Sequence, residues 1–154
     1  MTDATVPAAA PAEELPPLVW ASAFETGNAK LDGEHRELLV DINNLTRLLS
    51  EGREWWQIVT LSKELRDKCV DHFLDEQVVL ERSKYTKLAA HLREHRYIEK
   101  QLDDILACIS AVARPSRAEV EAVLYLRSIL IHHFFRYDIA YKSHLLRSRN
   151  QPRD

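Results

Sequence analysis

The sequence predicts an all-α protein, an up-down-up-down four-helix bundle with a flexible N-terminal arm. Apolar residues recur at helical spacing in four long blocks, and no stretch alternates apolar and polar residues as a strand does. Between Leu31 and Arg149 the only glycine and proline residues are Gly33, Gly52 and Pro115, which favours long helices. Short connections between long amphipathic helices make successive helices antiparallel.

Residues that stop or cap helices lie at the ends of these blocks. Gly52 separates the first block from the second, and Arg114-Pro115 stops the third. Ser116 and Glu119 have the spacing of a capping box, in which each side chain satisfies a backbone donor at the start of a helix. We therefore expect helices over residues 32–50, 54–82, 87–113 and 116–147.

The domain organisation follows from length and composition. The 154 residues are enough for one domain with a hydrophobic core. Alanine, proline and glutamate dominate the beginning of the chain, which favours a flexible arm. We expect this arm over residues 1–17, the bundle over 18–147 and a C-terminal tail over 148–154.

Composition and charge argue against several classes of function. The 21 basic and 24 acidic side chains are interspersed, and no basic stripe with aromatic residues indicates nucleic-acid binding. No apolar run approaches the roughly 20 residues that cross a bilayer, and the first residues do not resemble a secretory signal. Cys69 and Cys108 suit a reducing compartment. We expect a monomeric cytoplasmic protein without a membrane or nucleic-acid partner, and the sequence identifies no protein partner.

Histidine and carboxylate side chains lie on the apolar stripe of every predicted helix. The stretch HLREH, residues 91–95, places two imidazoles one helical turn apart on one face. The stretch HFLDEQ, residues 72–77, does the same for an imidazole and a carboxylate. The residues that share an inward position are His35, His72, Glu76, His91, His95, His133 and Asp138.

So many polar groups in one interior indicate bound metal. Burying them without partners costs on the order of several kcal/mol per ionised group, which a marginally stable domain cannot absorb. Metal removes this cost, because imidazole and carboxylate become its ligands.

Five imidazoles and two carboxylates exceed one tetrahedral zinc site, so we expect two ions. With bridging carboxylates and a bridging solvent oxygen, these ligands fill all but one of about twelve octahedral positions. The remaining position suits one small ligand.

The spacing of His133 and Asp138 requires an irregular helix or a site that reaches around the helix. Residues five apart are about 140° apart at roughly 100° per residue. The two side chains can converge if the helix widens by a π-type turn. His133, rather than His132, continues the apolar row of Leu126 and Leu130.

The combination of motifs resembles one known family. The motifs are Trp20-x-x-x-Phe24-x-x-Gly27, Leu31-Asp32-Gly33-Glu34-His35, Asn43-Asn44-Leu45, His72-Phe73-x-x-Glu76, His91-x-x-x-His95 and His133-x-x-x-x-Asp138-x-x-Tyr141. Together they resemble the hemerythrin family, more narrowly its bacterial single-domain members, the bacteriohemerythrins. They span about residues 18–146.

The resemblance implies a non-haem diiron centre with an oxo or hydroxo bridge and dioxygen as the ligand. One iron is then held by His91, His95 and His133, and the other by His35 and His72. Glu76 and Asp138 would bridge the two irons. The open position belongs to the iron with two histidines, where dioxygen is expected to bind end-on.

Two residues depart from the family's usual pattern near the site. Ile129 lies one turn before His133, where tryptophan is frequent, and Phe134 follows the histidine, where a smaller aliphatic residue is usual. Together with Leu38 and Leu130, these residues are expected to form the oxygen pocket. Phe134 either fills the space of the missing tryptophan or obstructs the open position.

Three functions fit these residues. The favoured one is a protein that binds dioxygen reversibly for storage, delivery or scavenging, with no catalytic residue. The second is a diiron oxidase or peroxidase. Ferritin-like oxidases, however, use carboxylate-rich sites with Glu-x-x-His, which this sequence lacks, and an imidazole-rich set favours reversible binding. The third is a sensor of oxygen, nitric oxide or iron that acts through a separate partner.

Overall fold

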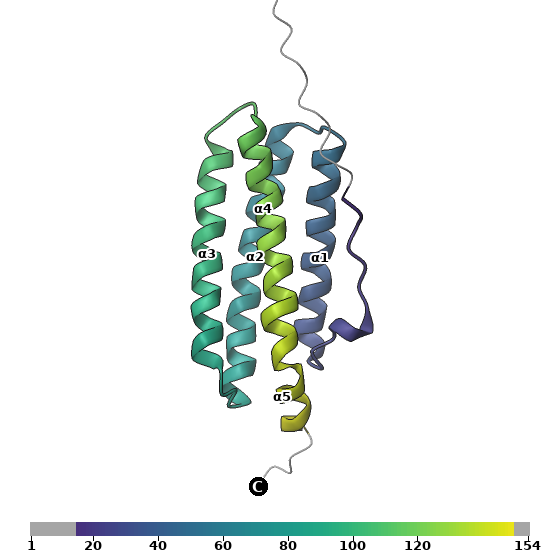
Figure 1. Ribbon diagram of the computed structural model, residues 1–154, viewed down its shortest axis with the longest axis vertical. Helices are drawn as coiled ribbons and strands as arrows, with labels where there is room; N and C mark the ends of the chain where they lie inside the picture. Colours follow the sequence, from purple (N-terminus) through teal and green to yellow (C-terminus); the bar gives the residue numbers. More distant parts are fainter. Residues whose placement is uncertain (1–14, 150–154) are drawn as a thin grey trace, which may run out of the picture.

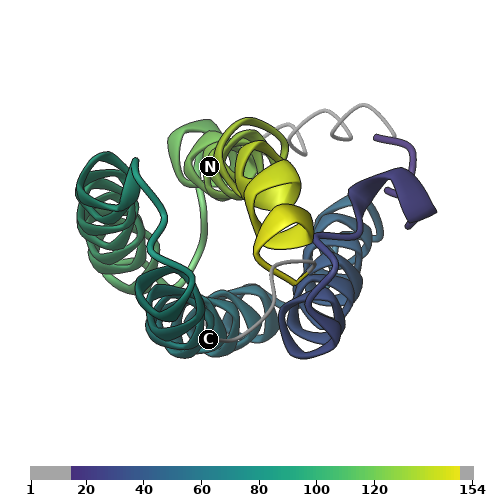
Figure 2. The same ribbon diagram turned by 90° about the horizontal axis from the view of Figure 1, so that it is seen from below.

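The protein is a four-helix bundle, as the sequence predicts. The computed structural model describes residues 15–149. Figure 1 shows the four long helices side by side, and Figure 2 shows them around a common interior. Each helix contacts the next along the chain, and α1 also contacts α4, which closes the bundle. The helices are α1 (Ala29–Ser50), α2 (Trp55–Arg82), α3 (Leu88–Ser110), α4 (Arg117–His133) and a C-terminal α5 (Ile139–Arg149).

The ends of the helices follow from local capping. The first helix begins three residues earlier than expected, because the side chain of Asn28 accepts hydrogen bonds from the backbone N–H groups of Lys30 and Leu31. The predicted capping box of α4 is confirmed. The backbone N–H of Ser116 donates to the Glu119 carboxylate at 2.7 Å, and the Ser116 hydroxyl accepts from the backbone of Ala118.

Apolar clusters fill the interior of the bundle on both sides of the site residues. Its largest cluster draws on all four long helices and excludes water from the centre of the bundle. A second, smaller cluster of Leu31, Leu80, Tyr141 and Leu145 closes the opposite end. The site residues therefore lie between two apolar layers.

A single π-helical turn joins α4 to α5. This turn, η2 (Phe134–Asp138), continues the helix without a break, because the residues on both sides of it keep helical backbone angles. The π-type turn, one of the two alternatives that the spacing of His133 and Asp138 left open, is thus confirmed. The extra residue of this turn shifts the inward positions that follow it. Tyr141 is therefore buried, whereas Ala140 is exposed.

The segment before α1 runs along the outside of that helix and then turns at a short 3-10 helix, η1 (Ser22–Phe24) (Figure 1). The backbone of Leu18 exchanges two hydrogen bonds of 2.8 Å with the side chain of Asn43. The Trp20 ring contacts Phe134 of the π turn, with 5.8 Å between centroids. Residues 1–14 of the expected arm and residues 150–154 of the expected tail lie outside the described residues, so those boundaries stay predictions.

The turn into α1 is held by a buried carboxylate. Asp32 accepts hydrogen bonds from the backbone N–H and the hydroxyl of Thr26, at 2.6 and 2.8 Å, and from the backbone of Gly27 at 3.3 Å. Gly27 has φ +89°, a conformation that favours glycine. These contacts fix where α1 begins and therefore where His35 lies.

Among the described helices, none is both long and apolar enough to span a membrane.

Candidate metal centre

Every helix of the bundle contributes to one buried polar cluster. α1 provides one member, α2 and α3 provide two each, and the continuous helix of α4 and η2 provides the last two. Each side chain is at most 5% exposed, so the cluster is shielded from bulk water. Its members are His35, His72, Glu76, His91, His95, His133 and Asp138. The structure thus brings together all seven residues that the sequence placed on the apolar stripes.

The cluster divides into two groups that share both carboxylates. Within each group, one ligand-type atom from every residue lies within 4.8 Å of the others. The first group contains three imidazoles, from His91, His95 and His133, together with Glu76 and Asp138. The second group contains the imidazoles of His35 and His72 and the same two carboxylates. Each of these two overlapping groups could hold a metal ion.

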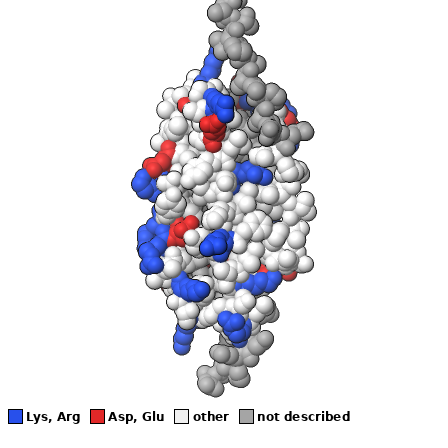
Figure 3. Space-filling view, viewed as in Figure 1, with Lys and Arg blue, Asp and Glu red and all other residues white. Residues whose placement is uncertain are grey.

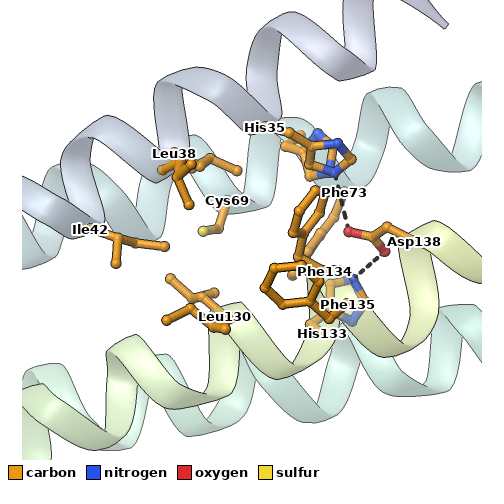
Figure 4. A pocket seen from close by; sticks show the side chains of 13 residues that line it. His35, Leu38, Ile42, Cys69, Phe73, Leu130, His133, Phe134, Phe135 and Asp138 are labelled. Atoms are coloured by element: carbon orange, nitrogen blue, oxygen red, sulfur yellow. Dashed lines mark hydrogen bonds and ion pairs between the residues drawn. The ribbon is translucent and has the colours of Figure 1, made fainter. Parts of the chain in front are cut away.

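Glu76 reaches two imidazoles of α3, and Asp138 reaches one imidazole of α1 and one of α4. Oε2 of Glu76 lies 2.8 Å from Nε2 of His91 and 2.9 Å from Nε2 of His95. Oδ2 of Asp138 lies 3.1 Å from Nε2 of His35, and Oδ1 lies 3.0 Å from Nε2 of His133. Figure 4 shows Asp138 between the last two rings. Asp138 therefore connects α1 with α4 across the interior.

Many of these atoms are buried without a hydrogen-bond partner. Nε2 of His95 and Nε2 of His133 are each close to a carboxylate oxygen, yet neither makes a hydrogen bond with it. Nε2 of His72, Oε1 of Glu76 and Oδ1 of Asp138 are also unpartnered. Unsatisfied buried polar atoms are rare and require an explanation. Lone pairs that converge without sharing hydrogens fit metal ions, and imidazole and carboxylate are suitable donors.

A second layer of contacts orients two of the imidazoles. Nδ1 of His72 lies 2.8 Å from Oε2 of Glu34, so this nitrogen carries the proton and Nε2 is left to point inward. The His95 ring stacks on Phe73, with centroids 3.9 Å apart and an angle of 10° between the planes. The sequence reasoning missed Glu34, although it immediately precedes His35 in the chain.

Both carboxylates remain anionic in the interior. Burial alone raises the pKa of Glu76, but the imidazoles of His91 and His95 outweigh it and hold that pKa well below its usual range. Burial and the neighbouring Glu76 raise the pKa of Asp138, whereas His133 and His35 lower it, and the net shift is downward. Two buried negative charges favour the binding of cations at this place.

A small apolar cavity of about 40 Å³ adjoins the second group (Figure 4). This is more than the roughly 10–15 Å³ that one water molecule requires. His35 and His72 form one side of it, and Leu38, Leu130 and Phe134 are part of its wall. Three of the four expected pocket residues therefore line a cavity beside the two-histidine group.

Ile129 is not among the residues that line this cavity, although we expected it there. It is buried in the large apolar cluster. The reason is helical geometry, because Ile129 lies about 100° around the helix from Leu130 and on the side away from Ile131. Ile131 lines the cavity instead.

Cys69 also lines the cavity but belongs to neither ligand group. Burial, together with the charges of Asp138 and Asp41, raises the pKa of its thiol well above the usual range. The side chain is therefore a neutral thiol, a small apolar wall residue. Both Cys69 and Cys108 are free cysteines.

The cluster predicts that substitutions of two adjacent histidines have very different effects on the metal content of the protein. His133 is buried in the first group, whereas His132 is exposed on the outer face of α4. We expect His133→Ala to lose at least one of two metal ions per chain, and His132→Ala to keep both. Elemental analysis of protein from iron-replete cells measures this directly. Equal losses in the two variants, or a larger loss from His132→Ala, would contradict the assignment.

The fold and the cluster together define a class, the helical bundles whose interior gathers histidine and carboxylate side chains into a metal-binding site. A family model described as the hemerythrin HHE cation binding domain matches residues 26–142. The chain belongs to this hemerythrin family. The matched range contains all seven residues of the cluster.

Individual relatives are distant. The chain is 32% identical over 88 residues to a bacteriohemerythrin of Clostridium acetobutylicum, which covers 55% of this chain and 68% of the relative. It is 28% identical over 87 residues to a bacteriohemerythrin of Pseudomonas paraeruginosa, and this match spans 56% of each protein. The chain thus matches little more than half the length of that relative. Myohemerythrin-1 of Phascolopsis gouldii is 25% identical over 129 residues, 84% of this chain and 95% of the relative.

A solved structure of a leucine-to-phenylalanine mutant has the same fold. It superimposes with a TM-score of 0.71 at 22% sequence identity, covering 83% of this chain and 96% of the other. At this identity the likeness concerns the fold alone.

Proposed function

We propose that this chain is a non-haem diiron protein that binds dioxygen reversibly, for storage, delivery or scavenging. The observation that carries the proposal is the position of the apolar cavity, which is lined by both imidazoles of the second group and by only one imidazole, His133, of the first. In this proposal His91, His95 and His133 hold one iron, and His35 and His72 hold the other. Glu76 and Asp138, which are common to both groups, would be shared between the two ions.

The donor set favours iron over a single zinc ion. Seven ligand side chains exceed the four of a closed tetrahedral zinc site, and no cysteine takes part. Two ferrous ions, when bound, supply the two electrons that dioxygen takes up and returns on release. The unequal number of imidazoles leaves the second group with fewer protein ligands, and both of its imidazoles line the cavity.

The residues around the cavity keep the ligand in a dry environment. Leu38, Leu130 and Phe134 present apolar surface, which disfavours water inside the cavity. The Phe134 ring lies against His35, with centroids 4.6 Å apart, and against the aromatic residues of the N-terminal segment. It therefore forms a wall, and the cavity of about 40 Å³ remains beside it. This supports the first of the two alternatives, in which Phe134 fills the space of the missing tryptophan.

The test is an optical experiment on the iron-loaded, full-length protein. Reduced protein is exposed to air, its ligand-to-iron charge-transfer band is recorded, and oxygen is then removed. Recovery of the original ferrous spectrum over repeated cycles supports a reversible oxygen binder. Prompt irreversible oxidation, with turnover on an added reductant, would instead support the oxidase or peroxidase.

A further inference from the structure

A second pocket opens at the surface between α1 and α2. Its volume is about 180 Å³, and carboxylates dominate its lining. The lining residues are Glu34, Glu37, Leu38, Lys68, Asp71, His72 and Asp75. Four carboxylates face a single amine, so the pocket has a negative potential that attracts cations.

This acidic pocket lies directly against the metal centre. Leu38 and His72 line both the pocket and the inner cavity. His72 is only 2% exposed, and its Nε2 has no hydrogen-bond partner. The Glu34 carboxylate links the two regions, because it lines the pocket and contacts Nδ1 of His72 at 2.8 Å. Glu34 and His72 thus connect the lining of the pocket with the cluster.

The charges in the pocket are only partly neutralised. Asp75 forms a salt bridge of 2.6 Å with Lys30, and Lys68 bonds to Asp41 outside the pocket. Within the described part of the chain, Glu37 and Asp71 form neither a hydrogen bond nor a salt bridge through their side chains. These two carboxylates are therefore available to a cation that arrives from solvent.

The cavity also adjoins a groove along α4 and η2, and the positive charge of this groove disfavours a cation. Ile131 and Phe135 line both the inner cavity and a groove along α4 and η2. The same groove is lined by Arg127 and Arg136. Figure 3, which looks onto the α4 side, shows blue Lys and Arg side chains spread over the lower part of this face. Electrostatics therefore favours the α1–α2 side for cations.

We propose that the acidic pocket is the route by which ferrous iron reaches the interior. Glu37 and Asp71 gather the hydrated cation, and Glu34 receives it beside His72. Carboxylate oxygens suit an incoming hydrated divalent cation, and imidazoles then hold iron more firmly inside. This inference rests on the proposed diiron function. It concerns the rate at which iron enters the protein, and the final iron content does not depend on the route.

The experiment measures uptake of ferrous iron by metal-free, full-length protein under anaerobic conditions. The double variant Glu37→Gln/Asp71→Asn removes two charges from the pocket without touching a cluster residue. The matched control, Glu99→Gln/Asp104→Asn, removes two charges from α3. At low ionic strength the pocket variant is expected to load about tenfold more slowly, and the control within about twofold of the unmodified protein. Salt should reduce the difference, because it screens surface charge.

A variant with the opposite effect completes the design. Lys68→Gln removes the one amine that lines the pocket and should speed uptake. All variants should finally hold the same iron content. If the pocket variant loads as fast as the unmodified protein, or if the control slows equally, the route is wrong while the diiron centre stands. If the unmodified protein takes up no iron at all, the diiron function fails and the route fails with it.

Discussion

Glu76→Gln is expected to remove both metal ions, because Glu76 belongs to both ligand groups. The substitution keeps the volume of the side chain but removes a charge that both ions share. Loss of outer contacts to a metal ligand costs about 10–100-fold in affinity, so loss of a shared ligand should cost more than about 100-fold. His35→Ala, by contrast, alters only the second group and should leave about one ion in place.

Elemental analysis after dialysis against a chelator measures both variants. Glu81→Gln is the matched control, because Glu81 lies on the same helix and is exposed. This control should keep both ions. Full metal content in Glu76→Gln would show that Glu76 is not a shared ligand, and circular dichroism establishes that each variant is folded.

Deletion of Arg136 is expected to preserve the site, whereas deletion of Ser128 should destroy it. Both residues are exposed and lie on the same continuous helix. Arg136 lies within the π turn, so its removal restores a regular helix in which the histidine and aspartate are four residues apart. His72 and Glu76 already present a histidine and a carboxylate at that spacing on α2.

Deletion of Ser128 removes a residue from a regular part of the helix, so no π turn is there to absorb the change. It rotates the first part of α4 by about 100° relative to the site. Either Val123 and Leu126 leave the core or His133 leaves the cluster, and burial lost at each large apolar side chain costs about 2–5 kcal/mol. Thermal unfolding and metal analysis measure the contrast. Equal metal loss in both deletions would show that the π turn itself is required for the site.

The fold could be predicted because periodicity and punctuation are local signals. Apolar spacing gave the four helices, and the Ser116 capping box placed the beginning of the last one. The π turn was one of two alternatives that the sequence allowed, since His133 and Asp138 could not share a face on a regular helix. The convergence of the seven polar residues followed from the same periodicity, because each is buried where an apolar residue would be expected.

The walls of the cavity were harder to predict, because they depend on the rotation of each helix and on distant segments. Ile129 and Ile131 are both apolar, and only the angle of α4 decides which one faces the cavity. The contact of Trp20 with Phe134 joins residues far apart in the sequence. Such pairings leave no periodic signal. The hydrogen bond between Glu34 and His72 likewise depends on how α1 and α2 meet.

Iron K-edge X-ray absorption of the iron-loaded protein tests the central claim most directly, because it detects neighbours of the metal. Two irons that share Glu76 and Asp138 should show an iron neighbour at about 3–4 Å, together with nitrogen and oxygen ligands and no sulfur. Iron content should be two per chain. An iron spectrum without an iron neighbour, or a chain that holds one zinc ion and takes up no iron, would contradict the account.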